Sequence, residues 1–195
     1  MDEQTQRESL ETIHRHSESL MRIISELLDL ARIEAGGATS LAIEPVDLVA
    51  IVQQVCSDLG FDKQRWPLQI AGTAHPVLIH ADRERLRQVF INILGNAQKY
   101  SPQGGAIDVN FVQSDTHVGV EVRDHGMGLT PQHLERIGRR FWRADKSGTI
   151  AGSGLGVAIV KEIMAMHGGH LQIESTHGEG SVFTLWFPKM PATPA

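Results

Sequence analysis

Three polar side chains fall on one narrow strip of a predicted helix in the segment QVFINILGNAQKYSP, residues 88–102. At about 100° per residue, Asn96 lies roughly 40° from Asn92, and Lys99 lies about 20° to its other side. The apolar residues that this helix would bury share a different face: Val89, Phe90, Ile93, Leu94 and Ala97. An amide oxygen is a suitable Mg²⁺ ligand, and a lysine can contact a phosphate. The strip is therefore either the wall of a ligand site, with Tyr100 against a base, or an ordinary solvated surface.

A carboxylate followed by two glycines ends the segment HVGVEVRDHGMGL, which alternates in the strand period. Asp124 falls at the end of the predicted strand, and Gly126 and Gly128 would let the backbone approach a flat ring closely. Because a carboxylate only accepts hydrogen bonds, Asp124 could bind the exocyclic amine of adenine and would repel the carbonyl of guanine. The alternative is a tight turn with a solvated Asp124.

The segment GSGLGVAIV places Gly152, Gly154 and Gly156 directly before a predicted helix. Free N–H groups at such a helix start, around Leu155, lie where phosphates bind. No strand is expected before this loop, and the pattern G-x-x-x-x-G-K-S/T is absent. A dinucleotide fingerprint and the usual phosphate loop are therefore both excluded.

The preceding segment RRFWRADKSGTIAG, residues 139–152, is interpreted as a mobile lid. Phe141 and Trp142 would anchor its start, and Arg143 and Lys146 could reach terminal phosphates. The alternative interpretation is a solvated basic run.

The elements that must position these residues follow from hydrophobic periodicity and turn signals. Helices are expected over residues 1–35, 48–59, 83–100 and 156–167, with a helical piece over 132–137, and strands over 75–82, 106–115, 117–124, 170–176 and 181–188. Asp47 and Asp82 are predicted N-caps, and a short connector precedes Asp47. Strands and helices are segregated more than alternating. We therefore expect an α+β fold, a two-layer sandwich in which helices cover one face of a mixed, mostly antiparallel sheet.

The first 35 residues carry a heptad-type seam, with apolar positions spaced by three and four. The seam consists of Leu10, Ile13, Ser17, Leu20, Ile24, Leu27 and Ala31. Gly36 and Gly37 would end this helix. Because a lone helix cannot bury such a stripe, we expect self-association or a further helix upstream.

Composition excludes several classes of protein. The 195 residues carry a net charge of −5, so a broad nucleic-acid surface is not expected. The single Cys56 cannot form an internal disulfide and lies among apolar residues, which predicts a core position. Neither a signal peptide nor an apolar run long enough to span a bilayer is found, so the expected compartment is cytoplasmic.

Taken in order, these motifs resemble the ATP-binding domain of sensor histidine kinases of two-component systems, which has the Bergerat fold of the GHKL superfamily. The resemblance runs from about Asp47 to Pro188, and it is highly specific because four motifs occur in order. It implies ATP and Mg²⁺ as ligands, with Asn92 and Lys99 as catalytic residues and Asn96 as the metal ligand. The residues implied to bind the nucleotide are Asn96, Lys99, Tyr100, Asp124, Gly126, Gly128, Arg143, Gly152, Gly154, Leu155 and Gly156.

The N-terminal helix resembles the second helix of the dimerisation and phosphotransfer bundle of the same kinases. The implied domains are a bundle remnant at 1–36, a catalytic domain at 40–189 and a flexible tail at 190–195. His14 and His16 lack the family's phosphoacceptor pattern, so the acceptor histidine is expected on a helix that this chain lacks. The implied partners are that helix, a response regulator and a second copy bound through residues 1–35, and the full-length protein would be anchored in the inner membrane.

The implied activity is transfer of the γ-phosphate to a histidine. In related ATPases a glutamate base stands at the position of Asn92, and an amide cannot accept a proton at neutral pH. Three alternatives remain open: an ATPase of the same superfamily, a serine kinase that acts as an anti-sigma factor, and a degenerate module used only for dimer contacts.

Overall fold

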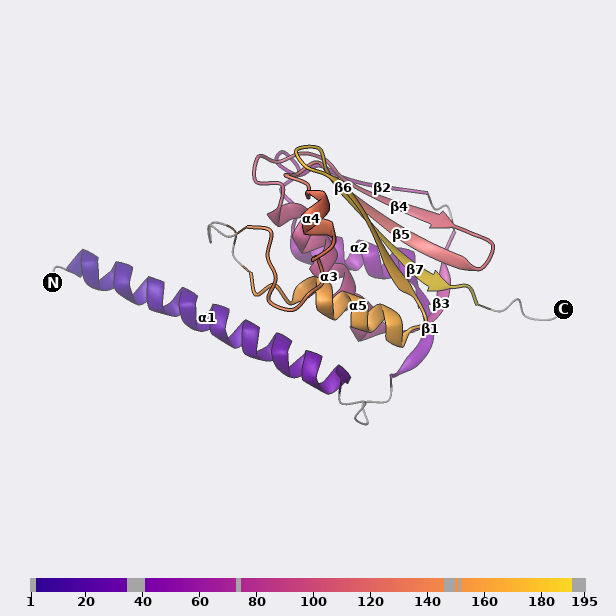
Figure 1. The fold of residues 1–195 in the computed structure, drawn as a ribbon, viewed down its shortest axis with the longest axis horizontal. Helices are drawn as coiled ribbons and strands as arrows, with labels where there is room; N and C mark the ends of the chain where they lie inside the picture. The colour runs from indigo at the N-terminus through magenta and orange to yellow at the C-terminus, as the bar shows by residue number, and fades with distance from the viewer. Residues whose placement is uncertain (1–2, 35–40, 73–74, 146–149, 151, 191–195) are drawn as a thin grey trace.

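The computed structural model describes residues 3–34, 41–72, 75–145, 150 and 152–190 (Figure 1). The helices are α1 (Glu3–Glu34), α2 (Leu48–Leu59), α3 (Arg83–Lys99), α4 (Pro131–Leu134) and α5 (Gly156–Met166). The strands are β1 (Ile43–Asp47), β2 (Leu68–Ala71), β3 (Leu78–Asp82), β4 (Ile107–Gln113), β5 (His117–Asp124), β6 (His170–Thr176) and β7 (Gly180–Pro188).

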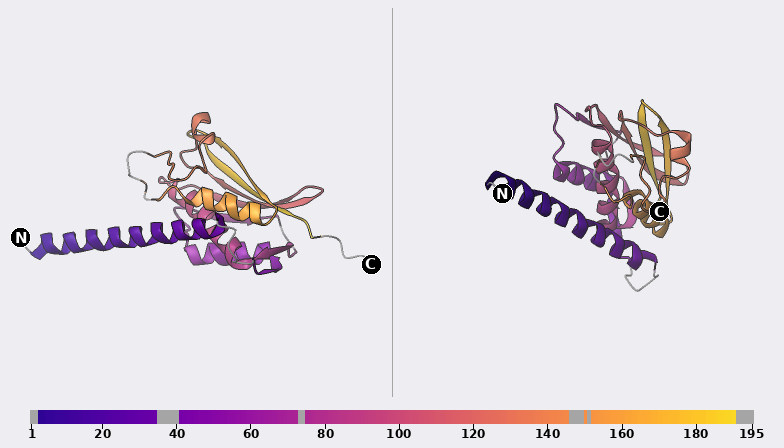
Figure 2. Two further views of the ribbon diagram at one scale, coloured as in Figure 1. Left: turned by 60° about the horizontal axis from the view of Figure 1, so that its bottom comes forward. Right: turned by 60° about the vertical axis from the view of Figure 1, so that its left-hand side comes forward.

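Five strands form one mixed sheet in the order β2-β4-β5-β7-β6. Only β2 and β4 pair in parallel, and the other neighbours are antiparallel. β1 and β3 form a separate antiparallel pair. Helices α2, α3 and α5 lie against one face of the sheet, as Figures 1 and 2 show. The expected two-layer α+β sandwich is therefore confirmed.

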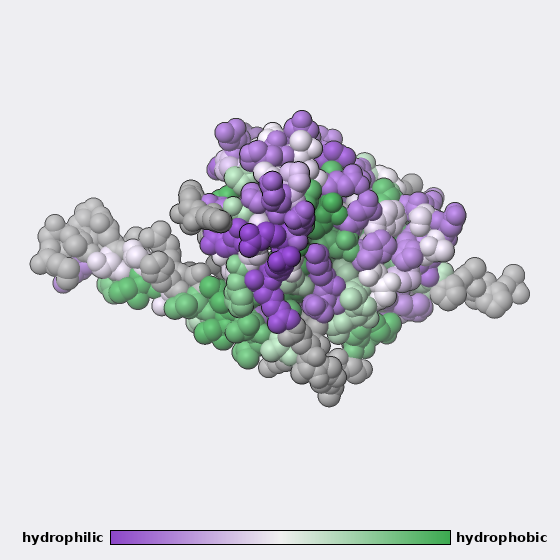
Figure 3. Space-filling model, in the orientation of Figure 1, coloured by the Kyte–Doolittle hydropathy of each residue, from purple (hydrophilic) through white to green (hydrophobic). Residues whose placement is uncertain are grey.

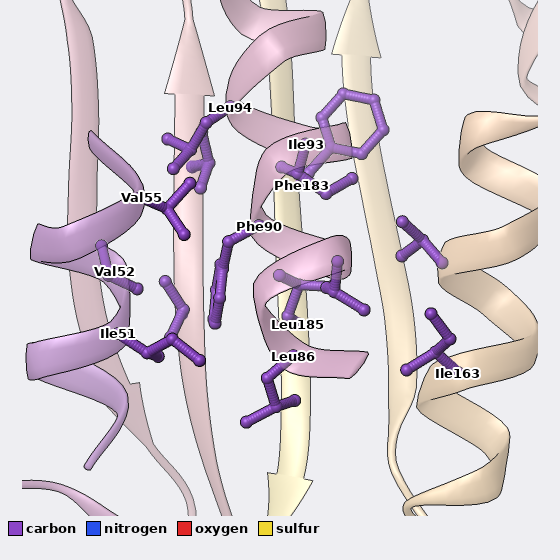
Figure 4. Close-up of a cluster of buried hydrophobic side chains, with 14 of the residues drawn as sticks. Ile51, Val52, Val55, Leu86, Phe90, Ile93, Leu94, Ile163, Phe183 and Leu185 are labelled. Carbon is purple, nitrogen blue, oxygen red and sulfur yellow. The ribbon is translucent and has the colours of Figure 1, made fainter. Parts of the chain in front are cut away.

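The core lies between this helical layer and the sheet. In Figure 4, Val52 and Val55 of α2 point toward Phe90 of α3, and Leu185 of β7 lies on the side of Phe90 away from α2. On the other side, Ile163 of α5 faces the same cluster. Burying this apolar stripe fixes α3 against the sheet, and so fixes the direction of its polar strip.

Both predicted N-caps are present. An Asp47 side-chain oxygen accepts a hydrogen bond from Val49 N at 3.0 Å, and an Asp82 oxygen accepts one from Arg85 N at 3.0 Å. Gly60 ends α2 with φ +60°, a conformation that glycine adopts without strain. The starts of α2 and α3 are thus set by local hydrogen bonds.

Two strands were not expected. β1 occupies the segment predicted to be a connector, because Pro45 cannot donate to a ladder and hides the strand pattern. β2 is only four residues long and mostly exposed, so it carries no alternation of burial. The helical piece is also shorter than predicted, since α4 ends at Leu134 and turns follow it.

Helix α1 confirms the predicted long helix and ends against the domain. Leu30 is 2% exposed and belongs to the core, whereas most of the predicted seam is exposed. Figure 3 shows apolar side chains gathered along this helix. The predicted stop at Gly36 and Gly37, and residues 191–195 of the tail, lie outside the described residues.

Two further sequence-based expectations concern Cys56 and membrane-spanning helices. Cys56 is buried and free, and burial raises the pKa of its thiol to about 11, so the expected core position is confirmed. Among the described residues, no helix is long and apolar enough to cross a membrane.

Candidate functional site

A cavity of about 410 Å³ lies where α3, the start of α5 and the ends of β5 and β7 meet. It brings together residues far apart in the sequence. The predicted site residues on its wall are Asn92, Asn96, Lys99, Tyr100, Asp124, Gly128, Arg143, Gly152, Gly154 and Gly156. Gly126 and Leu155 were predicted with them but do not line the cavity.

The polar strip of α3 forms one wall of this cavity. Asn92, Asn96 and Lys99 are each half-buried, so the strip is not an ordinary solvated surface. Asn92 Nδ2 donates to Gln88 O at 3.0 Å, which holds the amide oxygen toward the start of α5. A Cβ atom added at Gly156 would lie 2.7 Å from Asn92 Oδ1. A larger residue at position 156 would therefore push α5 away from α3.

Lys99 crosses the cavity toward the glycine-rich loop. Its Nζ lies 4.8 Å from the centre of the Tyr100 ring. A Cβ atom at Gly152 would collide with the same Nζ. The lysine charge thus lies beside the loop that precedes α5, the position that a phosphate contact requires.

Asp124 is buried at the end of β5. Its side chain is 5% exposed, and its Oδ1 accepts a hydrogen bond from Gly126 N at 2.9 Å. Burial raises the pKa of the carboxyl, while the backbone amides of Gly126 and Ser181, and then the nearby His125, oppose that rise. The alternative of a solvated aspartate is wrong.

The two glycines after Asp124 serve different contacts. A Cβ atom at Gly126 would collide with Tyr100 O, so this glycine lets the loop pack on the end of α3 rather than line the cavity. Gly128 has φ +61°, and a Cβ atom there would collide with Thr176 O. Both glycines therefore allow the loop after Asp124 to pack closely on neighbouring backbone, which fixes its course beside the cavity.

The glycine-rich loop leaves the start of α5 open to the cavity. The N-cap residue, Leu155, makes no side-chain capping hydrogen bond, and its own N–H donates to Ser153 Oγ at 3.1 Å. Leu155 is fully buried and does not line the cavity. Gly156 and Val157 line the cavity in the first turn of α5. Backbone N–H groups of a first helical turn suit an anion.

The predicted lid is anchored differently from expectation. Trp142 lines the cavity and packs edge-to-face on His133 at 5.5 Å between ring centres. Phe141 is 57% exposed with φ +59°, so its predicted anchoring role is wrong. The lid was interpreted from polarity, and polarity does not show which of two neighbouring aromatic rings turns inward.

Arg143 is held within its own loop. Its Nη2 donates to Ile150 O and lies 3.7 Å from Asp145 Oδ2. Its Nε is buried and finds no hydrogen-bond acceptor in the described part of the chain. Arg143 lines the cavity with these contacts in place. Lys146, the other predicted phosphate contact, lies outside the described residues.

Several lining residues were missed from the sequence. The apolar ones are Ile91, Met127, Leu129, Ile137, Val157 and Phe183. Ser153 lies inside the predicted loop and could have been included with it. Glu26 of α1 also lines the cavity and accepts a hydrogen bond from Ser153 Oγ. The two residues are 127 positions apart, so no local sequence signal connects them.

Two family models match this chain. Residues 81–191 match the family described as histidine kinase-, DNA gyrase B-, and HSP90-like ATPase. Residues 1–36 match the His Kinase A (phospho-acceptor) domain. Together these matches confirm the resemblance on both sides of the predicted domain boundary.

Similar proteins are named as histidine kinases. The circadian input-output histidine kinase CikA of Synechococcus elongatus is 34% identical over 192 residues, which cover 94% of this chain and 25% of that protein. Sensor histidine kinase ZraS of Escherichia coli K12 is 35% identical, over 89% of this chain and 36% of that protein. The chain thus spans about a quarter to a third of the length of these relatives.

Solved structures of histidine kinases are also similar to this chain. Full-length ShkA in complex with AMPPNP superposes with a TM-score of 0.79 and 28% identity, covering 98% of this chain and 40% of that one. The mycobacterial sensor histidine kinase MprB superposes with a TM-score of 0.67 and 29% identity, covering 77% of this chain and 99% of that one.

Proposed function

This chain belongs to the histidine kinase-, DNA gyrase B- and HSP90-like ATPase family, and from that premise we propose that it is the catalytic part of a sensor histidine kinase. It binds Mg-ATP and donates the γ-phosphate to a histidine on a helix other than α1. The observation that carries this proposal is the single cavity that joins the α3 strip, Asp124 and the start of α5. The proposed units are the bundle helix at 1–36 and the catalytic domain at 40–189.

The adenine end of the nucleotide is assigned to Asp124. Its carboxylate accepts a hydrogen bond from the exocyclic amine, and guanine, with a carbonyl at that place, is repelled. The burial of Asp124 strengthens this discrimination, because an unpaired polar group is costly away from water. Gly128 and Tyr100 line the same cavity.

The phosphates are assigned to the opposite end of the cavity. The open first turn of α5 offers backbone N–H groups, and Lys99 adds a positive charge beside the loop. Arg143 also lines the cavity and is assigned to the phosphates as a further positive charge. Asn96 places an amide oxygen on the same wall, which fits the oxygen ligands that Mg²⁺ prefers. The metal would neutralise part of the charge on the phosphates.

Transfer is favoured over hydrolysis by the chemistry of Asn92. Its amide cannot accept a proton from water at neutral pH, and its Nδ2 is already bonded to Gln88 O. ATP is therefore held until an acceptor arrives. The proposed partners are the helix that carries the acceptor histidine, a response regulator and a second copy bound through α1.

A calorimetric titration with ATP and Mg²⁺, followed by an assay for ADP in the same sample, tests this function. Binding in the micromolar range, about −8 kcal/mol at 1 μM, with almost no ADP formed is the expected result. Steady formation of ADP would instead indicate an ATPase that uses a base other than Asn92. Absence of binding would indicate a degenerate module.

A further inference from the structure

Helix α1 contributes one acidic side chain to the proposed nucleotide site. Glu26 is half-buried on the cavity wall, and its carboxylate accepts a hydrogen bond from Ser153 Oγ. The same Ser153 Oγ accepts a hydrogen bond from Leu155 N at 3.1 Å. A continuous path of hydrogen bonds therefore links the bundle helix to the start of α5.

Other contacts hold α1 in this position. Leu30, one turn beyond Glu26, is 2% exposed in the core. Asp29 Oδ2 accepts a hydrogen bond from Gln88 Nε2 at 3.3 Å. Helix α1 lies beside α5 in the views of Figures 1 and 2, and residues of the two helices are in contact. The position of Glu26 thus depends on the docking of the last turns of α1.

The carboxylate of Glu26 lies where an anion is favoured. The first turn of α5 is the positive end of the helix dipole, and its N-cap residue, Leu155, makes no side-chain capping hydrogen bond. Through Ser153, Glu26 brings a negative charge to this end. Nucleotide phosphates would be drawn to the same end and would be repelled by the carboxylate in a partly buried site.

We propose that Glu26 opposes the binding of nucleotide phosphates while α1 is docked, so that the position of the bundle helix sets nucleotide affinity. This inference rests on the proposed function. By linkage, nucleotide binding must loosen the docking of α1 by the same factor. Glu26 acts through charge and does not take part in phosphate transfer.

Replacing Glu26 by Gln in the full chain tests this role, because Gln keeps a hydrogen-bond acceptor and removes the charge. The Glu26→Gln variant is expected to bind ATP about fivefold or more tightly than the wild type. The gain for ADP is expected to be smaller, because ADP carries less phosphate charge. Calorimetry with both nucleotides, with excess magnesium, gives the two ratios. An equal gain for both nucleotides, or none, would overturn the proposal.

The matched control is Asp29→Asn. It removes the same charge from the same end of α1, but Asp29 does not line the nucleotide cavity, and the Asn side chain keeps an oxygen that can accept from Gln88 Nε2, so α1 stays docked. Both nucleotide affinities are expected to stay unchanged. If Asp29→Asn raised ATP affinity as much as Glu26→Gln, the gain in affinity would come from the loss of negative charge on α1 in general. The proposed specific role of Glu26 would then be wrong.

Hydrogen exchange supplies the reciprocal measurement. Saturating ATP is expected to speed amide exchange in the last turns of α1, and slower exchange there would contradict the proposal. Failure of the proposed function is distinguishable, because then neither the wild type nor Glu26→Gln would bind ATP. Binding by the wild type with no change in the variant would reject only the role of Glu26.

Discussion

The carboxylate of Asp124 lies in an environment that disfavours its charge. Burial raises its pKa above the ordinary value of 3.8, and the amides of Gly126 and Ser181 only partly oppose this. Between the two values the folded protein binds more protons than the unfolded chain, so stability falls as pH rises through this window. Perturbed carboxyl groups of this kind are common at functional sites. We infer that Asp124 is retained for recognition of a ligand, at a cost to stability.

Asp124→Asn is therefore expected to have opposite effects on binding and stability. ATP affinity should fall strongly, because the amide presents its own donors to the adenine amine. The free energy of unfolding of the wild type should fall relative to that of the variant as pH rises above 3.8. Calorimetry and urea unfolding at several pH values measure both quantities. The control is Asp115→Asn at an exposed turn, which should change neither. If the free energies of unfolding of the wild type and of Asp124→Asn changed in parallel with pH, this account of Asp124 would be wrong.

The amide oxygen of Asn96 is assigned to the metal, so Asn96→Ala should weaken ATP binding mainly when Mg²⁺ is present. Titrations with magnesium and with a chelator separate the two contributions. Asn110→Ala is the matched control, because Asn110 lies on β4 and donates to Glu121 at 3.3 Å, away from the cavity. An equal loss of affinity in both conditions would show that Asn96 has a structural role.

Residue types and spacing were sufficient to predict much of the site. Asparagines one turn apart lay on the opposite side from the apolar stripe, and a carboxylate before two glycines ended a strand. Trp142 lines the cavity and Phe141 does not, and this difference depends on backbone angles such as the positive φ of Phe141. Residue types alone do not specify those angles. Glu26 reaches the site only through tertiary docking, so no local pattern could include it.

At the scale of elements, Asp47 joins two segments. Its Oδ1 caps α2 through Val49 N and also accepts from Val77 N, both at 3.0 Å, and Val77 lies just before β3. Asp47→Ala should therefore lower the free energy of unfolding by about 1–3 kcal/mol, since one cap and one further bond are lost. Urea unfolding measures this change. Asp62→Ala, which removes an exposed turn contact to Gln64 N, should cost less. A smaller loss for Asp47→Ala would show that the cap contributes little.

The predictability of the elements followed the clarity of their periodicity. β4, β5 and β6 alternate along much of their length, and β7 is an apolar run that follows a glycine turn, so these strands and the two hairpins could be predicted. β1 and β2 could not, because one contains Pro45 and the other is very short. The parallel pairing of β2 with β4 depends on a long-range contact, which periodicity does not encode.

At the scale of the whole molecule, α1 combines two surfaces. Its last turns dock on the domain through Leu30, whereas the seam before them stays exposed. The seam could be predicted from heptad spacing, but the docking of its end could not. In Figure 3 the apolar side chains of α1 form an extended stripe beside the domain. Such stripes mark interaction surfaces, and a second α1 would supply a complementary apolar stripe.

We therefore expect the chain to form a dimer through α1. The double variant Leu20→Glu with Ile24→Lys places a favourable pair four residues apart, so the helix should persist while the apolar seam is lost. These side chains are 59% and 55% exposed in the single chain. Sedimentation equilibrium should show a dimer for the wild type and a monomer for the variant. Ile70→Glu, at an exposed position on the edge strand β2, should remain a dimer. A dimer that survived the double substitution would have to form through the catalytic domain, and α1 would then need a different partner to cover its seam.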